Sequence, residues 1–329
     1  MASGNGQGRR PSALIAIPMV PLVVAIALAT FVWPAANLEP RDLPFGLAGP
    51  VEELGSVQAR LEAREGAFDV RLYDDHESAR EAIEDREIYG AIVAESGGLS
   101  LLTSSAASPT VAALLSEDFA GPSVAVEDVV QADPDDPRGA AFGSMVLPLL
   151  LAGIVTGVII TMLGRPGLGA IGILVAVSAL TGLVTIVVVQ GWLGIIEGPW
   201  LLNAAVLSLG VLAVGSAVAG LAALIGRAGI AVMALLMVFV GNPWSGNVSA
   251  PELLPKAAGF VGQLLPPGAG GQLLRSTAFF DRAGAGGPLA VLLVWIGLGL
   301  GSLLAGAQLR QRAGVAQREE PSVEPGGEE

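Results

Sequence analysis

Long uncharged runs, separated by one or a few charged residues, dominate the second half of the chain. The runs that contain no Asp, Glu, Lys or Arg cover residues 140–164, 166–196, 198–226, 228–251 and 283–309. A charged side chain at mid-bilayer costs roughly 2.5–3.5 kcal/mol, and about 20 apolar helical residues are needed to cross the hydrocarbon core. The pattern therefore predicts five closely spaced membrane spans within residues 139–309. We place these spans at 140–163, 168–190, 201–225, from 228 to an interruption at 241–243, and 288–309.

Another apolar run, at residues 13–34, follows a Gly-rich head at 1–12 that carries the pair Arg9-Arg10. The segment Ala27-Leu28-Ala29 also fits the cleavage site of a signal peptide, which is the alternative interpretation. The run stays apolar through Trp33, however, where cleaved signals turn polar. We therefore expect an uncleaved first transmembrane helix at 13–34.

The stretch from 35 to 138 has a different pattern, in which short alternating or apolar runs are followed by amphipathic ones. The expected strands are 45–48, 68–73, 91–94, 99–103 and 124–130, and the expected helices are 51–64, about 75–87 and 109–119. Alternation of strands and helices is typical of a small α/β domain. The fold class that we predict is an α-helical polytopic membrane protein with six transmembrane helices and an extracytoplasmic α/β domain between the first and second spans.

Charge sets the predicted orientation. Only 14% of the residues are charged, against roughly 25% in an ordinary soluble domain. Residues 35–138 hold 22 Asp and Glu against 7 Arg, a net charge of −15 in a chain whose net charge is −13. The links at Arg165 and Arg227 are short and basic, and three arginines lie in the acidic tail at 310–329. Because positive charge favours the cytoplasmic side, we expect both termini inside and the acidic domain at 35–138 outside.

The stretch at 241–287 breaks the pattern with many Pro and Gly residues. The run from Ile230 to Val240 would cover only about 16 Å as a helix, which is too short to cross a bilayer. Broken backbone is tolerated at membrane depth only where protein or water covers its free polar groups. We therefore expect short outer helices that dip back onto the bundle as a re-entrant segment. An ordinary apolar outer loop is the alternative.

Three motifs in this stretch carry a family resemblance. Gly241-Asn-Pro-Trp-Ser-Gly, Ala250-Pro-Glu-Leu-Leu-Pro and Leu264-Leu-Pro-Pro-Gly-Ala-Gly-Gly resemble the outer signature of bacterial type-2 ABC exporter (ABC-2) permeases. The nearest branch is the YhgE/phage-infection-protein (Pip)-like group, whose ectodomain pattern the segment Asp85-Arg-Glu-Ile-Tyr-Gly-Ala-Ile-Val also resembles. One span, a large outer domain and five further spans form a similar layout.

The resemblance implies the membrane subunit of an exporter in the bacterial cell membrane, as a homodimer or heterodimer, with ATP hydrolysed by a separate subunit. The residues expected to form an outer gate are Asn242, Pro243, Ser245, Gly246, Pro266, Pro267, Gly268 and Gly270. In such permeases, cytoplasmic elements contact the ATPase and transmit its conformational change to the membrane helices. The inner links around Arg165 and Arg227 are much shorter than those elements. They favour the alternative, a non-transporting envelope receptor or assembly scaffold of the same group.

Other chemistry finds little support in the sequence. The single lysine, Lys256, is not in a phosphate-binding loop, so we expect no cofactor on this chain and ATP only on a partner. The predicted spans contain no carboxylate or His for proton coupling. His76 is more consistent with solvated surface than with a metal site, and Asp133-Pro-Asp-Asp136 is more consistent with an acidic linker than with a calcium site.

The absence of Cys argues against thiolate chemistry, and the absence of a basic footprint argues against nucleic-acid binding. We assign no catalytic residue and expect no enzyme.

Small residues at a spacing of four suggest close helix packing. The pairs are Gly153 with Gly157, Ser216 with Gly220, and Gly297 with Gly301. Polar residues in the same spans either line a seam between helices or bond to their own backbone, and the sequence leaves both open. These residues are Thr156, Thr181, Thr185, Gln190, Asn203 and Ser208.

Overall fold

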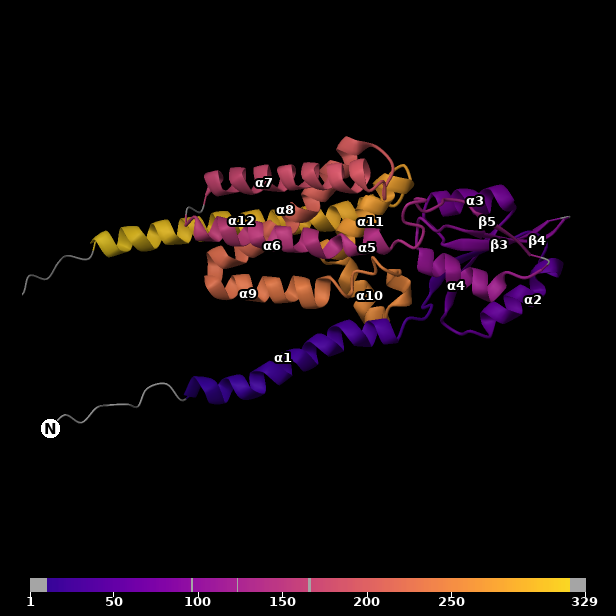
Figure 1. Ribbon diagram of the computed structural model, residues 1–329, viewed down its shortest axis with the longest axis horizontal. Coiled ribbons are helices and arrows are strands. Elements are labelled where there is room, and N and C mark those ends of the chain that lie inside the picture. Colours follow the sequence, from indigo (N-terminus) through magenta and orange to yellow (C-terminus); the bar gives the residue numbers. More distant parts are fainter. Residues whose placement is uncertain (1–10, 96, 123, 165–166, 320–329) are drawn as a thin grey trace, which may run out of the picture.

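The computed structural model describes residues 11–95, 97–122, 124–164 and 167–319. A bundle of helices occupies one end of the molecule and an α/β domain the other (Figure 1). The predicted head at 1–12 lies mostly outside the described residues, as do the link residue Arg165 and the last ten residues of the tail. Helix α1 (Pro11–Ala36) covers the first predicted span, and Pro18 and Pro21 lie within it.

The α/β domain is built on a five-stranded mixed sheet with the order β2-β1-β3-β4-β5. Strand β1 pairs in parallel with both β2 and β3, β4 is antiparallel to β3, and β5 is parallel to β4. The strands are β1 (Leu43–Ala48), β2 (Phe68–Tyr73), β3 (Gly90–Glu95), β4 (Gly98–Thr103) and β5 (Val124–Asp128). The helices are α2 (Val51–Glu62), α3 (His76–Glu84) and α4 (Pro109–Phe119). Each expected strand and helix of this domain is present within a few residues of its predicted bounds.

Two apolar layers fix the helices to the sheet. On one face, Phe45 of β1 stacks on Phe119 of α4 with ring centroids 5.3 Å apart, and α2 packs beside them. On the other face, Ala79, Ala82 and Ile83 of α3 are buried against the sheet. Local capping agrees with this packing. The side chains of Asp75 and Ser108 accept hydrogen bonds from backbone N–H groups in the first turns of α3 and α4.

Helix α8 (Trp200–Ile225) is the centre of the bundle. Helices α6 (Val146–Met162), α7 (Leu168–Ile186) and α12 (Gly286–Glu319) pack around it. The short helix α5 (Ala140–Ser144) precedes α6, and a π-helical turn, η1 (Val187–Trp192), extends α7. Among the described residues, five helices are long and apolar enough to cross a membrane. They are Ile17–Ala36, Ala140–Met162, Leu168–Trp192, Trp200–Ile225 and Gly286–Arg310.

The segment after α8 is shorter than a span. It consists of α9 (Arg227–Leu236) and the π-helical turn η2 (Met237–Gly241), which together form a 15-residue apolar helix. Short helices then follow as expected for 241–287. These are the 3₁₀ turn η3 (Pro251–Leu253), α10 (Lys256–Gln263) and α11 (Pro266–Phe279).

Glycines on α6 and α8 permit close helix contacts. A Cβ added at Gly153 would lie 2.7 Å from Val214, and one added at Gly157 would lie 2.7 Å from the Gly215 carbonyl oxygen. At the α8–α12 contact the close pair is Gly220 and Gly299.

Gly297 and Gly301 have no close packing partner among the described residues, so the packing role predicted for them stays a prediction. A Cβ at either position would meet nothing within 4 Å, because both face outward from α12. Gly299 lies on the opposite side of the helix, where its added Cβ would come within 2.4 Å of the Ser216 carbonyl carbon.

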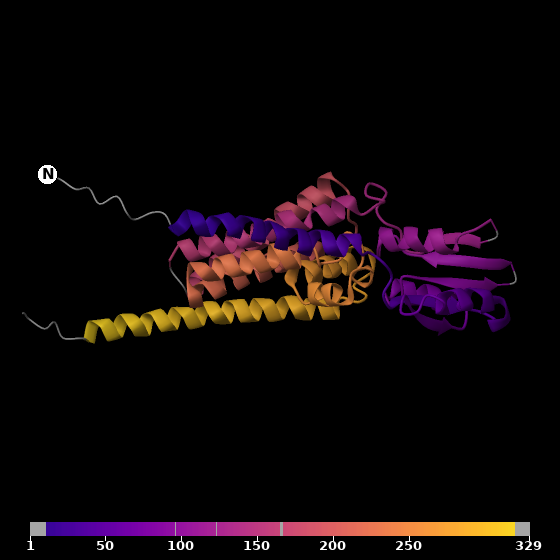
Figure 2. The same ribbon diagram turned by 90° about the horizontal axis from the view of Figure 1, so that it is seen from below.

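Helix α1 lies at the edge of the bundle and contacts mainly η2 (Figure 2). Phe31 meets Phe239 edge-on at 6.1 Å, and the Trp244 indole donates a hydrogen bond of 3.1 Å to the Thr30 carbonyl. The start of α1 and the end of α12 both lie at the end of the bundle away from the α/β domain.

Candidate functional site at the junction of domain and bundle

Helix α11 is buried along almost its whole length although four of its fourteen residues are polar. Pro266 and Pro267 begin it, in the first-turn positions where proline costs no hydrogen bond. Gln272, Arg275 and Ser276 are 8%, 3% and 0% exposed. Spacings of three and four residues place these three side chains on one side of the helix. A buried polar stripe on such a helix indicates contacts beyond apolar packing.

Arg86 from the α/β domain reaches this stripe. Its Nη1 donates to the Gln272 carbonyl at 3.1 Å and to the Ser276 hydroxyl at 2.5 Å, and its Nη2 donates to Gln272 Oε1 at 2.5 Å. The guanidinium carbon also lies 5.1 Å from the ring centroid of Phe280. One side chain thus joins the end of α3 to two successive turns of α11.

The backbone at Arg86 is unusual for a side chain of this size. Its φ is 61°, in the left-handed region that usually holds Gly just after a helix. The Arg86 and Glu87 N–H groups donate to the Ile83 and Ala82 carbonyls, which closes the end of α3. A non-Gly residue here costs of order 1 kcal/mol, and such strain persists where surrounding contacts impose it. The hydrogen bonds of Arg86 to α11 are contacts of this kind and hold its backbone in the left-handed region.

Arg275 is the second cation of the junction, and unlike the half-buried Arg86 it is fully buried. Its guanidinium carbon lies 4.5 Å from the ring centroid of Phe142, and its Nη2 donates to the Asn247 carbonyl at 3.3 Å. Among the described residues, Arg275 Nη1 and Asn247 Oδ1 are buried without a hydrogen-bond partner. Burying a cation with an unpaired donor lowers the free energy of unfolding. Apolar packing alone therefore does not explain why this position holds an arginine.

Tyr89 and Glu252 form a third contact between the domain and the re-entrant segment. The phenol donates to Glu252 Oε2 at 2.7 Å. Burial and the neighbouring carboxylate raise the pKa of Tyr89 well above its ordinary value, so the phenol remains a neutral donor. Burial lowers the pKa of Arg86.

A cavity of about 230 Å³ lies between these groups. The domain lines the cavity with Arg86, Glu87 and Tyr89 and with Pro44, Ile88 and Ala107, and the segment 241–287 contributes Glu252, Gln263 and Gln272. Pro288, near the start of α12, completes one side. The cavity therefore lies where the two parts of the protein meet.

Further hydrogen bonds surround the junction and restrict movement of the domain. The Ser108 hydroxyl donates to the Ser249 carbonyl at 2.5 Å, and Arg41 Nη1 donates to the Leu253 carbonyl at 2.8 Å. Lys256 Nζ lies 2.5 Å from Asp42 Oδ2 in an exposed ion pair.

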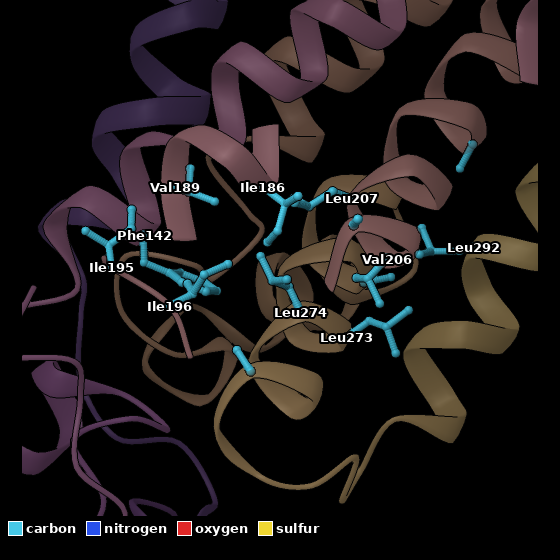
Figure 3. Close-up of a cluster of buried hydrophobic side chains, with 14 of the residues drawn as sticks. Phe142, Ile186, Val189, Ile195, Ile196, Val206, Leu207, Leu273, Leu274 and Leu292 are labelled. Carbon is cyan, nitrogen blue, oxygen red and sulfur yellow. The ribbon is translucent and has the colours of Figure 1, made fainter. Parts of the chain in front are cut away.

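The opposite side of α11 is held by the bundle. The Thr277 hydroxyl donates to Asn203 Oδ1 at 2.8 Å, and Asn203 Nδ2 donates to the Glu197 carbonyl at 2.6 Å. Leu273 and Leu274 belong to one apolar cluster with side chains from α5, η1, α8 and α12 (Figure 3). Helix α11 is therefore clamped between the bundle and the α/β domain.

The residues predicted to form a gate are spread over this region. Asn242 and Pro243 follow η2, and the Ser245 hydroxyl donates to the Asn242 carbonyl at 2.8 Å. Gly246 has a φ of 68°. The remaining four, Pro266, Pro267, Gly268 and Gly270, lie in the first turns of α11.

A second cavity, of about 50 Å³, lies beside the start of α11. Three of the predicted residues, Pro266, Pro267 and Gly270, line it together with apolar residues of α6 and α8. Gly268 instead touches α10, since an added Cβ would come within 2.2 Å of the Gly262 carbonyl oxygen. Only part of the predicted set therefore meets in one place.

Sequence reasoning did not assign a role to the polar residues that join the two parts. Arg275 gives a usable signal, because it is the only charged residue between Lys256 and Asp281. An isolated Arg in an apolar stretch indicates a buried partner or a functional position. Arg86 gives no such signal, because five of its neighbours at 80–87 are also charged.

The other candidates have local roles. His76 Nε2 lies 3.3 Å from Glu127, and no group of three metal-ligating residues occurs in the described ranges. Asp136 accepts hydrogen bonds from the Ala141 and Phe142 N–H groups and so caps α5. In the bundle, Thr156, Thr181, Thr185 and Ser208 donate to carbonyls four residues earlier, whereas Asn203 and Gln190 bond across elements.

Comparison of the chain with protein-family models, with curated proteins and with solved structures finds no match.

Proposed function

We propose that the protein is the permease subunit of an ABC-2-type exporter in a bacterial cytoplasmic membrane, with six crossings and the α/β domain outside. Helix α8 ends at the far end of the bundle, and the chain is back at the domain end by the time it reaches α11. The intervening segment of α9, η2 and residues 242–250 supplies the sixth crossing. Five crossings come from the five helices of span length.

The distribution of charge supports this orientation. Arg227 begins α9 and Arg310 lies beside Ala223 near the end of α8, so both are at the end of the bundle away from the domain. The acidic domain lies at the opposite end. Positive charge favours the cytoplasmic side, so the termini are inside and residues 35–138 are outside.

The observation that carries the transport proposal is helix α11. It enters the bundle from the domain end, begins with Pro266-Pro267-Gly268, and binds Arg86 of the domain on one side and Asn203 of the bundle on the other. Broken helices inside a bundle are typical of proteins that open a path through the membrane. Movement of this helix would open or close the outer side.

The proposal also includes a separate ATPase subunit and a second membrane subunit. The spans carry no carboxylate or His with which to use a proton gradient, so a separate ATPase subunit supplies the energy. The outward-facing Gly297 and Gly301 on α12 suit a seam with a second membrane subunit, because small residues let helix backbones approach closely.

The test is purification of the full chain with its native membrane partners, followed by ATP hydrolysis in liposomes. We expect an ATPase to copurify and its activity to change when Gln272→Leu removes the side-chain acceptor of Arg86. If no ATPase copurifies under mild extraction, the exporter proposal fails.

A second candidate function is an envelope receptor or assembly scaffold that moves nothing. The inner connections favour it. Helices α8 and α9 are joined at Gly226, and α6 and α7 are separated only by residues 163–167. Copurification of envelope proteins without an ATPase is the result expected from this function.

A further inference from the structure

Three charged residues, Arg86, Glu87 and Glu252, line the 230 Å³ cavity at the junction, and Arg86 pairs with neither carboxylate. In the part of the chain that the structure describes, no carboxylate lies within 4.0 Å of the Arg86 guanidinium. Its hydrogen bonds go to neutral acceptors on Gln272 and Ser276. The carboxylate of Glu252 accepts its side-chain hydrogen bond from a neutral phenol.

Charges removed from water are normally paired with charges of opposite sign. Here the cation comes from the α/β domain and the anion from the re-entrant segment, and both line the same space. Each of the two is held by hydrogen bonds to neutral groups and not by an ion pair, so its charge is not neutralised by the other.

The remaining lining suits a small polar molecule. Two glutamines line the cavity: Gln263, whose Nε2 donates to the Ser245 carbonyl, and Gln272, whose Oε1 accepts from Arg86. Pro44, Ile88 and Pro251 supply apolar walls. A volume of about 230 Å³ holds a molecule of amino-acid size rather than a long chain.

We propose that this cavity binds a small zwitterion, with the anionic oxygens of the ligand on Arg86 and its ammonium group on Glu252. The ligand bridges the α/β domain and the re-entrant segment and so tightens the junction when it is bound. A free amino-acid-like molecule and the headgroup of phosphatidylethanolamine share this chemistry. The inference does not depend on transport, because it concerns binding alone.

The test is calorimetric titration of the full-length protein in detergent micelles. The zwitterionic probes are L-serine and O-phosphoethanolamine. The comparison ions, inorganic phosphate and ethylammonium, carry charge of one sign only. We expect at least one zwitterion to bind about tenfold or more tightly than either comparison ion, because each charged contact adds to affinity. Nanodiscs of phosphatidylethanolamine and of phosphatidylglycerol, compared by thermal unfolding, test the lipid source.

Two variants separate binding from folding. Glu252→Gln keeps the shape and can still accept from Tyr89, so we expect it to bind phosphate as before but to lose the preference for the zwitterion. Arg86→Gln is expected to lose phosphate and zwitterion together. The control Glu81→Gln changes an exposed carboxylate on α3 and should leave all titrations unchanged.

Each outcome decides the question. A response to the soluble zwitterions assigns a free ligand, and stabilisation in phosphatidylethanolamine nanodiscs alone assigns the lipid headgroup. Absence of both responses overturns the proposal. Binding of phosphate with an affinity equal to that of both zwitterions, or a zwitterion preference that survives in Glu252→Gln, also overturns it.

Discussion

The guanidinium of Arg275 lies over the ring of Phe142, with Cζ 4.5 Å from the ring centroid. This contact joins the re-entrant helix α11 to α5, whose first turn is capped by Asp136. Each element is fixed by a different kind of interaction, since α5 is held by a carboxylate cap and α11 by a cation on an aromatic face. Arg275 therefore connects the linker after the α/β domain to the proposed gate.

We expect Arg275→Met to raise the stability of the folded protein. The substitution keeps apolar contact with Phe142 and removes a buried cation whose Nη1 has no partner among the described residues. Replacing an under-satisfied buried charge by an apolar residue of similar size stabilises by about 1–4 kcal/mol in favourable cases. The measurement is the thermal unfolding midpoint in detergent. A clear fall in the midpoint would show that the cation is satisfied by a group outside the chain.

Two glycines of α11 should respond oppositely to Ala. A Cβ at Gly268 would lie 2.2 Å from the Gly262 carbonyl oxygen, whereas one at Gly270 would meet nothing within 4 Å. Gly268→Ala should therefore destabilise by about 1–3 kcal/mol through overpacking, and Gly270→Ala should be neutral or stabilise by about 0.5–1 kcal/mol. Thermal unfolding of the two variants checks this. Equal effects would mean that α10 and α11 do not contact each other closely.

A matched pair on α12 tests the packing against α8. Gly299→Ala would bring a Cβ to 2.4 Å from the Ser216 carbonyl carbon, and Gly297→Ala fills open space. We expect Gly299→Ala to lower the unfolding midpoint and Gly297→Ala to leave it unchanged or raise it. If Gly297→Ala instead reduces the fraction of dimer on size-exclusion chromatography, the proposed seam between subunits gains support. The reverse order of the two midpoints would contradict the observed rotation of α12.

Replacing Arg86 with Gly should loosen the junction although Gly suits its backbone. The change relieves a φ of 61° but removes three hydrogen bonds to α11. We expect faster amide exchange in α11 and at the end of α3, measured by hydrogen–deuterium exchange mass spectrometry. Exchange in β4, which lies away from the contact, serves as the internal control. Unchanged protection of α11 would show that the other junction contacts suffice.

Single cysteines report the orientation without background, because the chain has none of its own. Glu62→Cys is exposed on the domain and Arg312→Cys is exposed on α12 beyond the apolar span. A membrane-impermeant maleimide should label the first in intact cells and the second only after permeabilisation. Labelling in the opposite order would reverse the proposed topology.

The α/β domain could be predicted almost element by element because its signals are local. The ranges expected for the five strands and three helices follow from the periodicity of apolar positions and from breaks in it. The membrane helices were equally accessible, since an apolar run of about 20 residues without charge is the length that a bilayer requires. These features depend on neighbours within a few residues.

The junction could not be predicted, since its partners are far apart in sequence. Arg86 and Gln272 are separated by 186 positions, and nothing local marks the pair. The rotation of α12 was missed for another reason. Gly297 and Gly299 point about 200° apart on a helix, and only the position of α8 decides which one faces a neighbour.

Helix α12 continues without a break from Gly286 beside the junction to Glu319, over 34 residues or about 51 Å. Its first turns adjoin the cavity wall at Pro288, and its last turns extend beyond the other helices at the opposite end (Figure 1). If α12 tilts as a rigid helix about its contact with α8, a small displacement of its first turns moves its last turns in the opposite direction. Under the proposed topology, ligand binding in the cavity would thereby shift the far end of α12, where a partner subunit would detect it without any long inner loop.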